Sequence, residues 1–225
     1  MSKGDDNMSL IMYLTRAPKY KNTTAKEIIL IESYLSWQHE NEIKSKYSCD
    51  TFEKWCSHSE NELPSKDTIN YYKPFWTTKP MYMEMIGDVE CRSIFEQLAR
   101  FVKANPIFNW FYNNVMEQNF DREYHEVTKN QLEDFLEICK KVKEDCITLV
   151  KENQHDITAM NEYIVNEDIA KELLPTYDNA QSYFGPNNYE SFYAYQVVNA
   201  IEVVSNILAN TDFEKQIIYL NFTSV

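Results

Sequence analysis

Apolar residues recur every three to four positions along much of the chain, which is the spacing of one face of an α-helix. The most regular segment runs from Thr128 to Asn153, and its opposite face carries Glu, Lys and Asp. Thr128 and Gln131 form a capping-box pair at its start. The apolar stripe of this predicted helix comprises Leu132, Phe135, Leu136, Cys139, Val142, Cys146, Leu149 and Val150.

The same spacing predicts several further helices. Two begin at Thr24 and Asp50, each followed three residues later by a glutamate, and the others span 92–104, 106–118, 157–174 and 189–209. Segment 106–118 holds too many large apolar side chains for an exposed helix, so we expect it at the centre of the core.

Two short runs have the β-branched and aromatic character of strands. They are 10–14 and 217–222, and we expect them to pair. The run 81–86 is also compatible with a strand. The chain has only three glycines, and tight turns consume glycine, so we predict a mainly α fold: a helical domain with a small β-sheet joining the N- and C-terminal segments. We expect all of 1–225 to form one domain, with 1–8 disordered and 57–80 a long loop.

Composition excludes several classes of protein. The three glycines, Gly4, Gly87 and Gly185, are too far apart to build a Walker loop or a dinucleotide fingerprint. No apolar stretch approaches the roughly 20 residues of a membrane-spanning helix, and the polar, acidic start lacks the features of a secretory signal. Five scattered cysteines are typical of reduced thiols that pack as small hydrophobic groups. We therefore expect a cytoplasmic protein without a membrane partner.

Charge is the most informative part of the composition. The 22 basic and 35 acidic residues give a net charge of −13. Residues 1–50 carry seven charges of each sign, whereas 151–214 hold two basic and eleven acidic residues, a local net charge of −9. This segment would repel nucleic acid, because polyanion binding needs a basic stripe. It would attract a basic protein. The plainer explanation is that a negative surface keeps the protein soluble.

No motif identifies a metal or cofactor site. Cys49, Cys56 and His58 come nearest to a zinc cluster, but no second pair of ligands accompanies them. We therefore predict no metal, no cofactor and no catalytic residue. One alternative stays open: His125, with Asp121, Glu123 and Glu126 around it, has the residue types for acid/base catalysis.

Tyrosines accompany the acidic residues of the C-terminal third, and tyrosine is a common interface anchor. Core packing explains many of these rings equally well. The residues that we predict to bind a partner are Glu167, Asp168, Glu172, Asp178, Tyr177, Tyr183, Tyr189 and Glu190.

Parts of the chain look familiar: Val102 to Phe111, Glu123 to Thr128, Tyr183-Phe184-Gly185, Thr211 to Tyr219 and Met8 to Leu14. In these stretches the chain resembles an uncharacterised family of bacteriophage and prophage proteins, loosely over 92–220 and at 8–14. It departs from the family at Phe108, where we expect a histidine, and 20–80 have no counterpart.

The resemblance implies a phage or mobile-element origin and no particular activity. By analogy with anti-CRISPR proteins, we expect an accessory protein that binds and inhibits a basic host defence protein, such as a CRISPR effector nuclease, in the host cytoplasm. The alternatives are a small enzyme of phage nucleotide or nucleic-acid metabolism that uses His125, and a structural component of the virion. The oligomeric state does not follow from the sequence.

Overall fold

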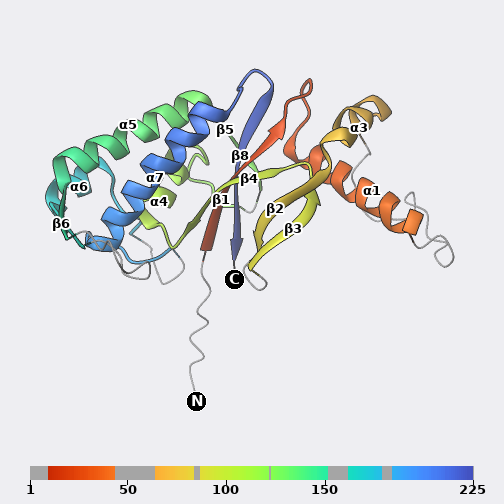
Figure 1. Ribbon diagram of the computed structural model, residues 1–225. Helices are drawn as coiled ribbons and strands as arrows, with labels where there is room; N and C mark the ends of the chain where they lie inside the picture. Colours follow the sequence, from red (N-terminus) through yellow and green to blue (C-terminus); the bar gives the residue numbers. More distant parts are fainter. Residues whose placement is uncertain are drawn as a thin grey trace, which may run out of the picture.

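The computed structural model describes residues 10–43, 64–83, 87–121, 123–151, 162–178 and 184–224. These residues form six α-helices, one short 3-10 helix (η1) and eight strands, shown in Figure 1. In chain order they are β1 (Leu10–Pro18), α1 (Ala25–Ile43), α3 (Lys66–Tyr72), η1 (Lys73–Phe75), β2 (Thr77–Met83), β3 (Gly87–Ser93), β4 (Glu96–Val102), α4 (Asn105–Asn114), β5 (His125–Val127), α5 (Lys129–Cys146), β6 (Ile147–Lys151), β7 (Glu162–Val165), α6 (Glu167–Leu173), α7 (Ser191–Asn210) and β8 (Gln216–Ser224).

A four-stranded antiparallel sheet in the order β4-β1-β8-β5 lies at the centre. Its middle pair joins two segments about 200 residues apart: Leu10 of β1 faces Ser224 of β8, and Pro18 faces Gln216. The predicted pairing of these two segments is confirmed. Two further hairpins, β2-β3 and β6-β7, form separate two-stranded sheets.

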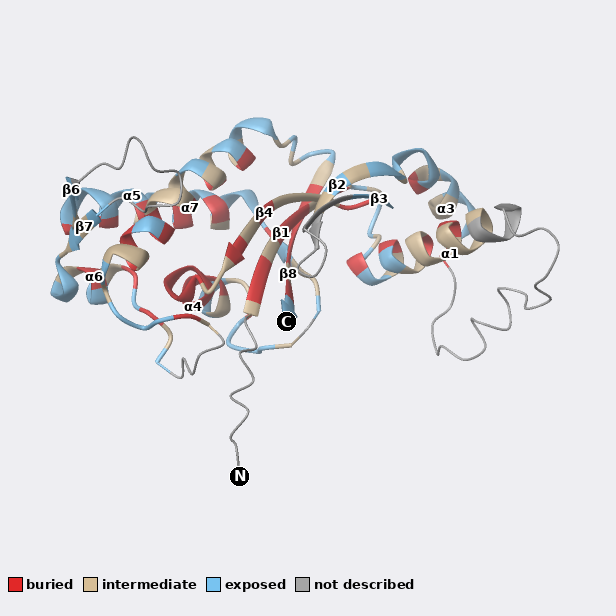
Figure 2. Ribbon diagram, turned by 60° about the horizontal axis from the view of Figure 1, so that its bottom comes forward, coloured by how far each residue is buried: buried red, intermediate tan, exposed pale blue. Residues whose placement is uncertain are grey.

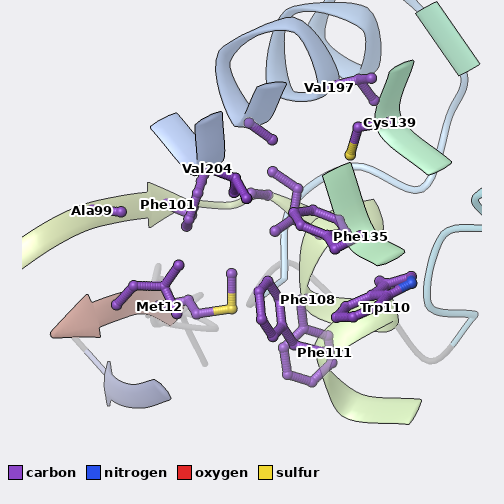
Figure 3. Close-up of a cluster of buried hydrophobic side chains, with 14 of the residues drawn as sticks. Met12, Ala99, Phe101, Phe108, Trp110, Phe111, Phe135, Cys139, Val197 and Val204 are labelled. Atoms are coloured by element: carbon purple, nitrogen blue, oxygen red, sulfur yellow. The ribbon is translucent and has the colours of Figure 1, made fainter. Parts of the chain in front are cut away.

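The central sheet is covered on both faces, because its strands bury alternate side chains in opposite directions. Even-numbered residues of β8, including Leu220, pack with α4, α5 and α7 in the larger core. Figure 3 shows the rings of Phe108 and Phe135 in this core. Odd-numbered residues of β8, Ile217 and Tyr219, pack with α1 and α3 in a smaller core. Figure 2 shows α1 and α3 at one end of the molecule and α6, β6 and β7 at the other.

Several predicted helices are present. Segment α4 lies in the larger core, and seven of its residues are buried. Helix α5 begins with the predicted capping box: Thr128 Oγ1 accepts from the N–H of Gln131, and Gln131 Oε1 accepts from the N–H of Thr128. Its buried stripe matches the prediction from Leu132 to Cys146. Helix α7 also lies where the pattern places it. The helix predicted from Asp50 lies outside the described residues.

The prediction of a mainly α fold is wrong, because eight strands make this an α+β protein. The largest error concerns 92–104, which form the end of β3 and all of β4 rather than a helix. Between Leu14 and Thr15 of β1 the pairing skips from Ala99 to Gln97, so Leu98 forms a bulge in β4. The bulge breaks the two-residue alternation, and the apolar spacing then imitates a helix.

Glycine scarcity was also a poor argument against strands. Lys21, Lys103, Glu117 and Gln118 all take positive φ values between 50° and 63° without being glycine. The chain can therefore reverse direction with few glycines, although this conformation is uncommon for such residues.

Three other segments differ from the predictions. The expected loop 57–80 contains, in its described part, α3, η1 and the start of β2. The helix expected to reach Asn153 ends at Cys146, because the Ile-Thr-Leu-Val run that follows is rich in β-branched residues and forms β6. The described part of 157–174 is β7 followed by α6 rather than one helix. No helix among the described residues is long and apolar enough to cross a membrane.

Candidate functional site

The structure gathers most of the predicted partner-binding residues at one end of the molecule, around α6 and the start of α7 (Figure 1). We call this region the acidic end and define it by six exposed carboxylates: Glu162, Glu167, Asp168, Glu172, Asp178 and Glu190. Lys171 is the single basic residue within 162–178 and 184–210. The acidic end therefore carries an excess of five negative charges. Its backbone continues into the β6-β7 hairpin on one side and into α7 on the other.

Three predicted residues, Glu167, Asp178 and Tyr189, line a concavity of about 430 Å³ within the acidic end. Lys171 lies in the same concavity, where its Nζ is 2.6 Å from Glu167 Oε1 and 5.7 Å from the centre of the Tyr189 ring. The hydrogen bond with Glu167 raises the pKa of Lys171. Both partners of this ion pair are more than half exposed, so the pair contributes little to stability.

The loop that precedes α7 is held in place by buried polar groups. The Tyr189 hydroxyl accepts from the N–H of Thr176 at 3.0 Å, and Thr176 Oγ1 donates to the Asn187 carbonyl at 3.2 Å. Asn105 is fully buried at the start of α4, and its Oδ1 accepts from the N–H of Tyr177. These contacts fix the wall of the concavity to the core, which limits the entropy lost when a ligand binds there.

The remaining predicted residues have different surroundings. Tyr177 is half-buried, and its ring lies 5.3 Å from that of Phe108 and 5.2 Å from that of Phe184, so it belongs to an aromatic cluster of the larger core. Glu190 occupies the N-cap position of α7. Tyr183 lies outside the described residues.

Position along the helices separates the carboxylates into two groups. Glu167 and Asp168 lie in the first turn of α6, and Glu190 precedes α7. Negative charge at these places is favourable because it faces the positive end of the helix dipole. Glu172 lies in the last turn of α6, where negative charge is unfavourable, and Asp178 lies beyond the helix. Stabilisation of the helix ends therefore explains the carboxylates of Glu167, Asp168 and Glu190. It does not explain those of Glu172 and Asp178.

Exposed apolar side chains accompany the charges, and sequence reasoning missed them. Leu149, Val150 and Ile164 of the β6-β7 hairpin are exposed by 50%, 52% and 64%, and Tyr195 of α7 by 42%. Ile164 faces Thr148 across the hairpin. Leu149 and Val150 had been predicted on the buried stripe of a helix, so their exposure could not be recognised before β6 was known. Apolar groups beside uncompensated charge are typical of a protein-binding surface.

His125, the candidate acid/base residue, has only part of the predicted surroundings. Its Nε2 lies 2.8 Å from Asp121 Oδ1. Desolvation acts to raise the pKa of Asp121, but hydrogen bonds from the Glu123 N–H and from His125 outweigh it, so the pKa of Asp121 is lowered. Glu126 follows His125 directly in β5 and therefore points to the opposite face of the sheet. His125 does not line the concavities of about 760, 430 and 240 Å³ in the described part of the chain.

The described residues contain no group of three or more His, Cys, Asp or Glu side chains arranged to hold a metal ion. Cys49, Cys56 and His58 lie outside them. Comparison of the chain with protein-family models, with curated proteins and with solved structures gives no match.

Proposed function

We propose that this chain is a binding protein. Its acidic end binds a positively charged, nucleic-acid-binding protein and so inhibits that partner. The observation that carries the proposal is the coincidence of uncompensated carboxylates with exposed apolar side chains at the same end. Glu172 and Asp178 supply charge that the helices do not need, and Ile164 and Tyr195 supply apolar contact area. Charge steers the partner and apolar burial then retains it.

The chemistry of the surface favours a protein partner over nucleic acid. Phosphates would be repelled by the excess of five negative charges, and no described basic stripe runs across the acidic end. A groove built to hold nucleic acid is lined with lysine and arginine, and carboxylates can occupy the places of phosphates there. The partner class that we propose is a basic host defence protein, such as a CRISPR effector nuclease in the bacterial cytoplasm. The resemblance to phage proteins agrees with this role.

The experiment compares two variants with equal changes of charge. Glu172→Lys/Asp178→Lys alters the acidic end, whereas Glu123→Lys/Glu202→Lys alters exposed carboxylates elsewhere. Purified CRISPR effector nucleases are assayed for DNA cleavage with each form of the chain, at low and at high salt. We expect the wild type and the second variant to inhibit at least one nuclease. The first variant should lose inhibition by about tenfold or more, because two attractive contacts become repulsive.

A further variant, Ile164→Ser, tests the apolar part of the surface. It should weaken inhibition mainly by faster dissociation, with little change in the salt dependence of association. The proposal fails if no nuclease is inhibited and the chain captures no nucleic-acid-binding protein from a nuclease-treated bacterial lysate. It also fails if both double variants inhibit equally.

A further inference from the structure

A second concavity, of about 760 Å³, is lined by residues of β1, α3, η1, β2 and β4 and by the connection from α7 to β8. We call it the Lys79 groove, and the residues that define it are Arg16, Lys19, Tyr71, Phe75, Lys79 and Glu96. They come from the end of β1, from α3 and η1, and from the starts of β2 and β4. The volume lies in the range of about 300 to 1,000 Å³ that is usual for small-molecule sites. Four of the lining residues are basic and three, Glu96, Asp212 and Glu214, are acidic, whereas the whole chain carries a net charge of −13.

Half of these basic residues are already neutralised. Arg16 contacts Glu96 Oε2 through Nε at 3.2 Å and Nη2 at 2.8 Å, and its Nη1 donates to the Asn210 carbonyl. Lys215 is 3.0 Å from Asp212. Lys19 and Lys79 have no carboxylate oxygen within 4 Å in the described part of the chain. Among the described residues, the groove therefore presents two ammonium groups without an ion-pair partner within 4 Å.

Lys79 is the more constrained of the two. It projects from β2 and is half-buried, and its Nζ donates one hydrogen bond, to the Ile94 carbonyl. Burial lowers the pKa of Lys79, although the charges of Glu32 and Glu96 act in the opposite direction. An ammonium group has three donors, and the described residues accept from one of them, which leaves two for a ligand. A half-buried cation with unused donors is stabilised when an anion binds beside it.

Aromatic rings and a free acceptor complete the groove. Tyr71 stacks on Tyr20 with the ring centres 4.1 Å apart, and its hydroxyl donates to the Lys19 carbonyl, so the ring is held rigidly. Phe75 lies 5.5 Å from Tyr71 and is 39% exposed, which leaves a ring surface open to solvent. The two hydrogen bonds from Arg16 to Glu96 both end on Oε2, and no described residue donates a hydrogen bond to Oε1.

We propose that the Lys79 groove binds a small phosphorylated ring compound of the nucleoside monophosphate type. A phosphate monoester carries a charge of about −1.5 to −2 at neutral pH and so neutralises both Lys19 and Lys79, whereas a carboxylate neutralises one of them. The planar base lies against Phe75, and a ribose hydroxyl donates to Glu96 Oε1. The six carboxylates of the acidic end do not line this groove, so the proposal stands whether or not the chain binds a basic protein.

The experiment measures binding of the four ribonucleoside monophosphates to the purified chain by isothermal titration calorimetry at low salt. Adenosine and inorganic phosphate serve as probes of the two halves of the ligand. We expect at least one mononucleotide to bind, and adenosine and phosphate to bind at least about tenfold more weakly, because each lacks one set of contacts. Lys19→Ala and Phe75→Ala should each weaken mononucleotide binding severalfold.

Lys79→Gln should weaken binding by about tenfold, because it removes a charge-assisted hydrogen bond. If Lys79→Gln lowers the melting temperature, its loss of binding could come from unfolding. The variants at the two exposed positions, Lys19→Ala and Phe75→Ala, then test the site. Lys66→Ala, at an exposed lysine of α3 outside the groove, is the matched control and should leave binding unchanged. The proposal is overturned if no mononucleotide binds at millimolar concentration. It is also overturned if phosphate or adenosine alone binds as tightly, or if Lys19→Ala and Phe75→Ala have no effect.

Discussion

Replacing Gly185 by alanine should destabilise the protein strongly. Gly185 has φ +91°, and a Cβ added there would lie 2.0 Å from the carbonyl oxygen of Lys103. The atom it meets belongs to the backbone and cannot swing away. A positive φ costs an L-residue roughly 1–2 kcal/mol. The displaced loop would also strain two hydrogen bonds, from Asn105 Nδ2 to the Gly185 carbonyl and from the Tyr177 N–H to Asn105 Oδ1, which are worth about 1 kcal/mol each. We expect a loss of about 2–4 kcal/mol in the free energy of unfolding.

Urea denaturation followed by circular dichroism measures this loss as a shift of the midpoint at constant slope. Pro186→Ala changes the exposed neighbour in the same loop and should alter the free energy of unfolding by less than about 0.5 kcal/mol. A loss below about 1 kcal/mol for Gly185→Ala, with the slope unchanged, would refute the reasoning, because the strain and the overlap together exceed that value.

Three further predictions concern the Glu32 carboxylate, the Thr128 cap and the buried Tyr72. Glu32→Leu should cost about 2–5 kcal/mol in urea denaturation, and Glu32→Gln clearly less, because the Glu32 carboxylate accepts from the backbone N–H groups of Ile94 and Phe95. Thr128→Ala should cost about 1 kcal/mol, measured by thermal unfolding, through loss of the capping box. Desolvation raises the pKa of Tyr72 to about 12. The unfolded chain therefore ionises first, and stability that is complete below about pH 10 falls as the pH rises toward 12. Tyr72→Phe should flatten this fall in denaturation curves; an unchanged fall would contradict the assignment.

The sequence pattern predicted correctly the elements that depend on interactions between residues a few positions apart. The Thr128 cap and the stripe of α5 depend on residues a few positions apart, so their prediction was reliable. The pairing of β1 with β8 was predictable because both runs have strand character. Strand β4 was not, since the bulge at Leu98 is specified by its register against β1 and leaves a helix-like spacing in the sequence.

The candidate sites likewise differ in how far each depends on one sequence segment or on the tertiary fold. The acidic end was visible in the sequence because its carboxylates lie close together in one segment with one lysine. The exposed hairpin residues Leu149 and Ile164 were not, because exposure depends on where β6 and β7 pack. The Lys79 groove has no local motif at all, since Arg16, Tyr71 and Lys79 meet only through the tertiary fold.

Strand β8 enters the sheet between β1 and β5, and this position affects the order of assembly during translation. Until residues 216–224 leave the ribosome, β1 has only β4 as a neighbour and β5 has no described neighbour. The high contact order of the β1-β8 pair slows folding, because a long loop must close before the pair forms. Nascent chains should therefore expose the unpaired edge of β1 until β8 has been made, and a chaperone can protect that edge in the meantime.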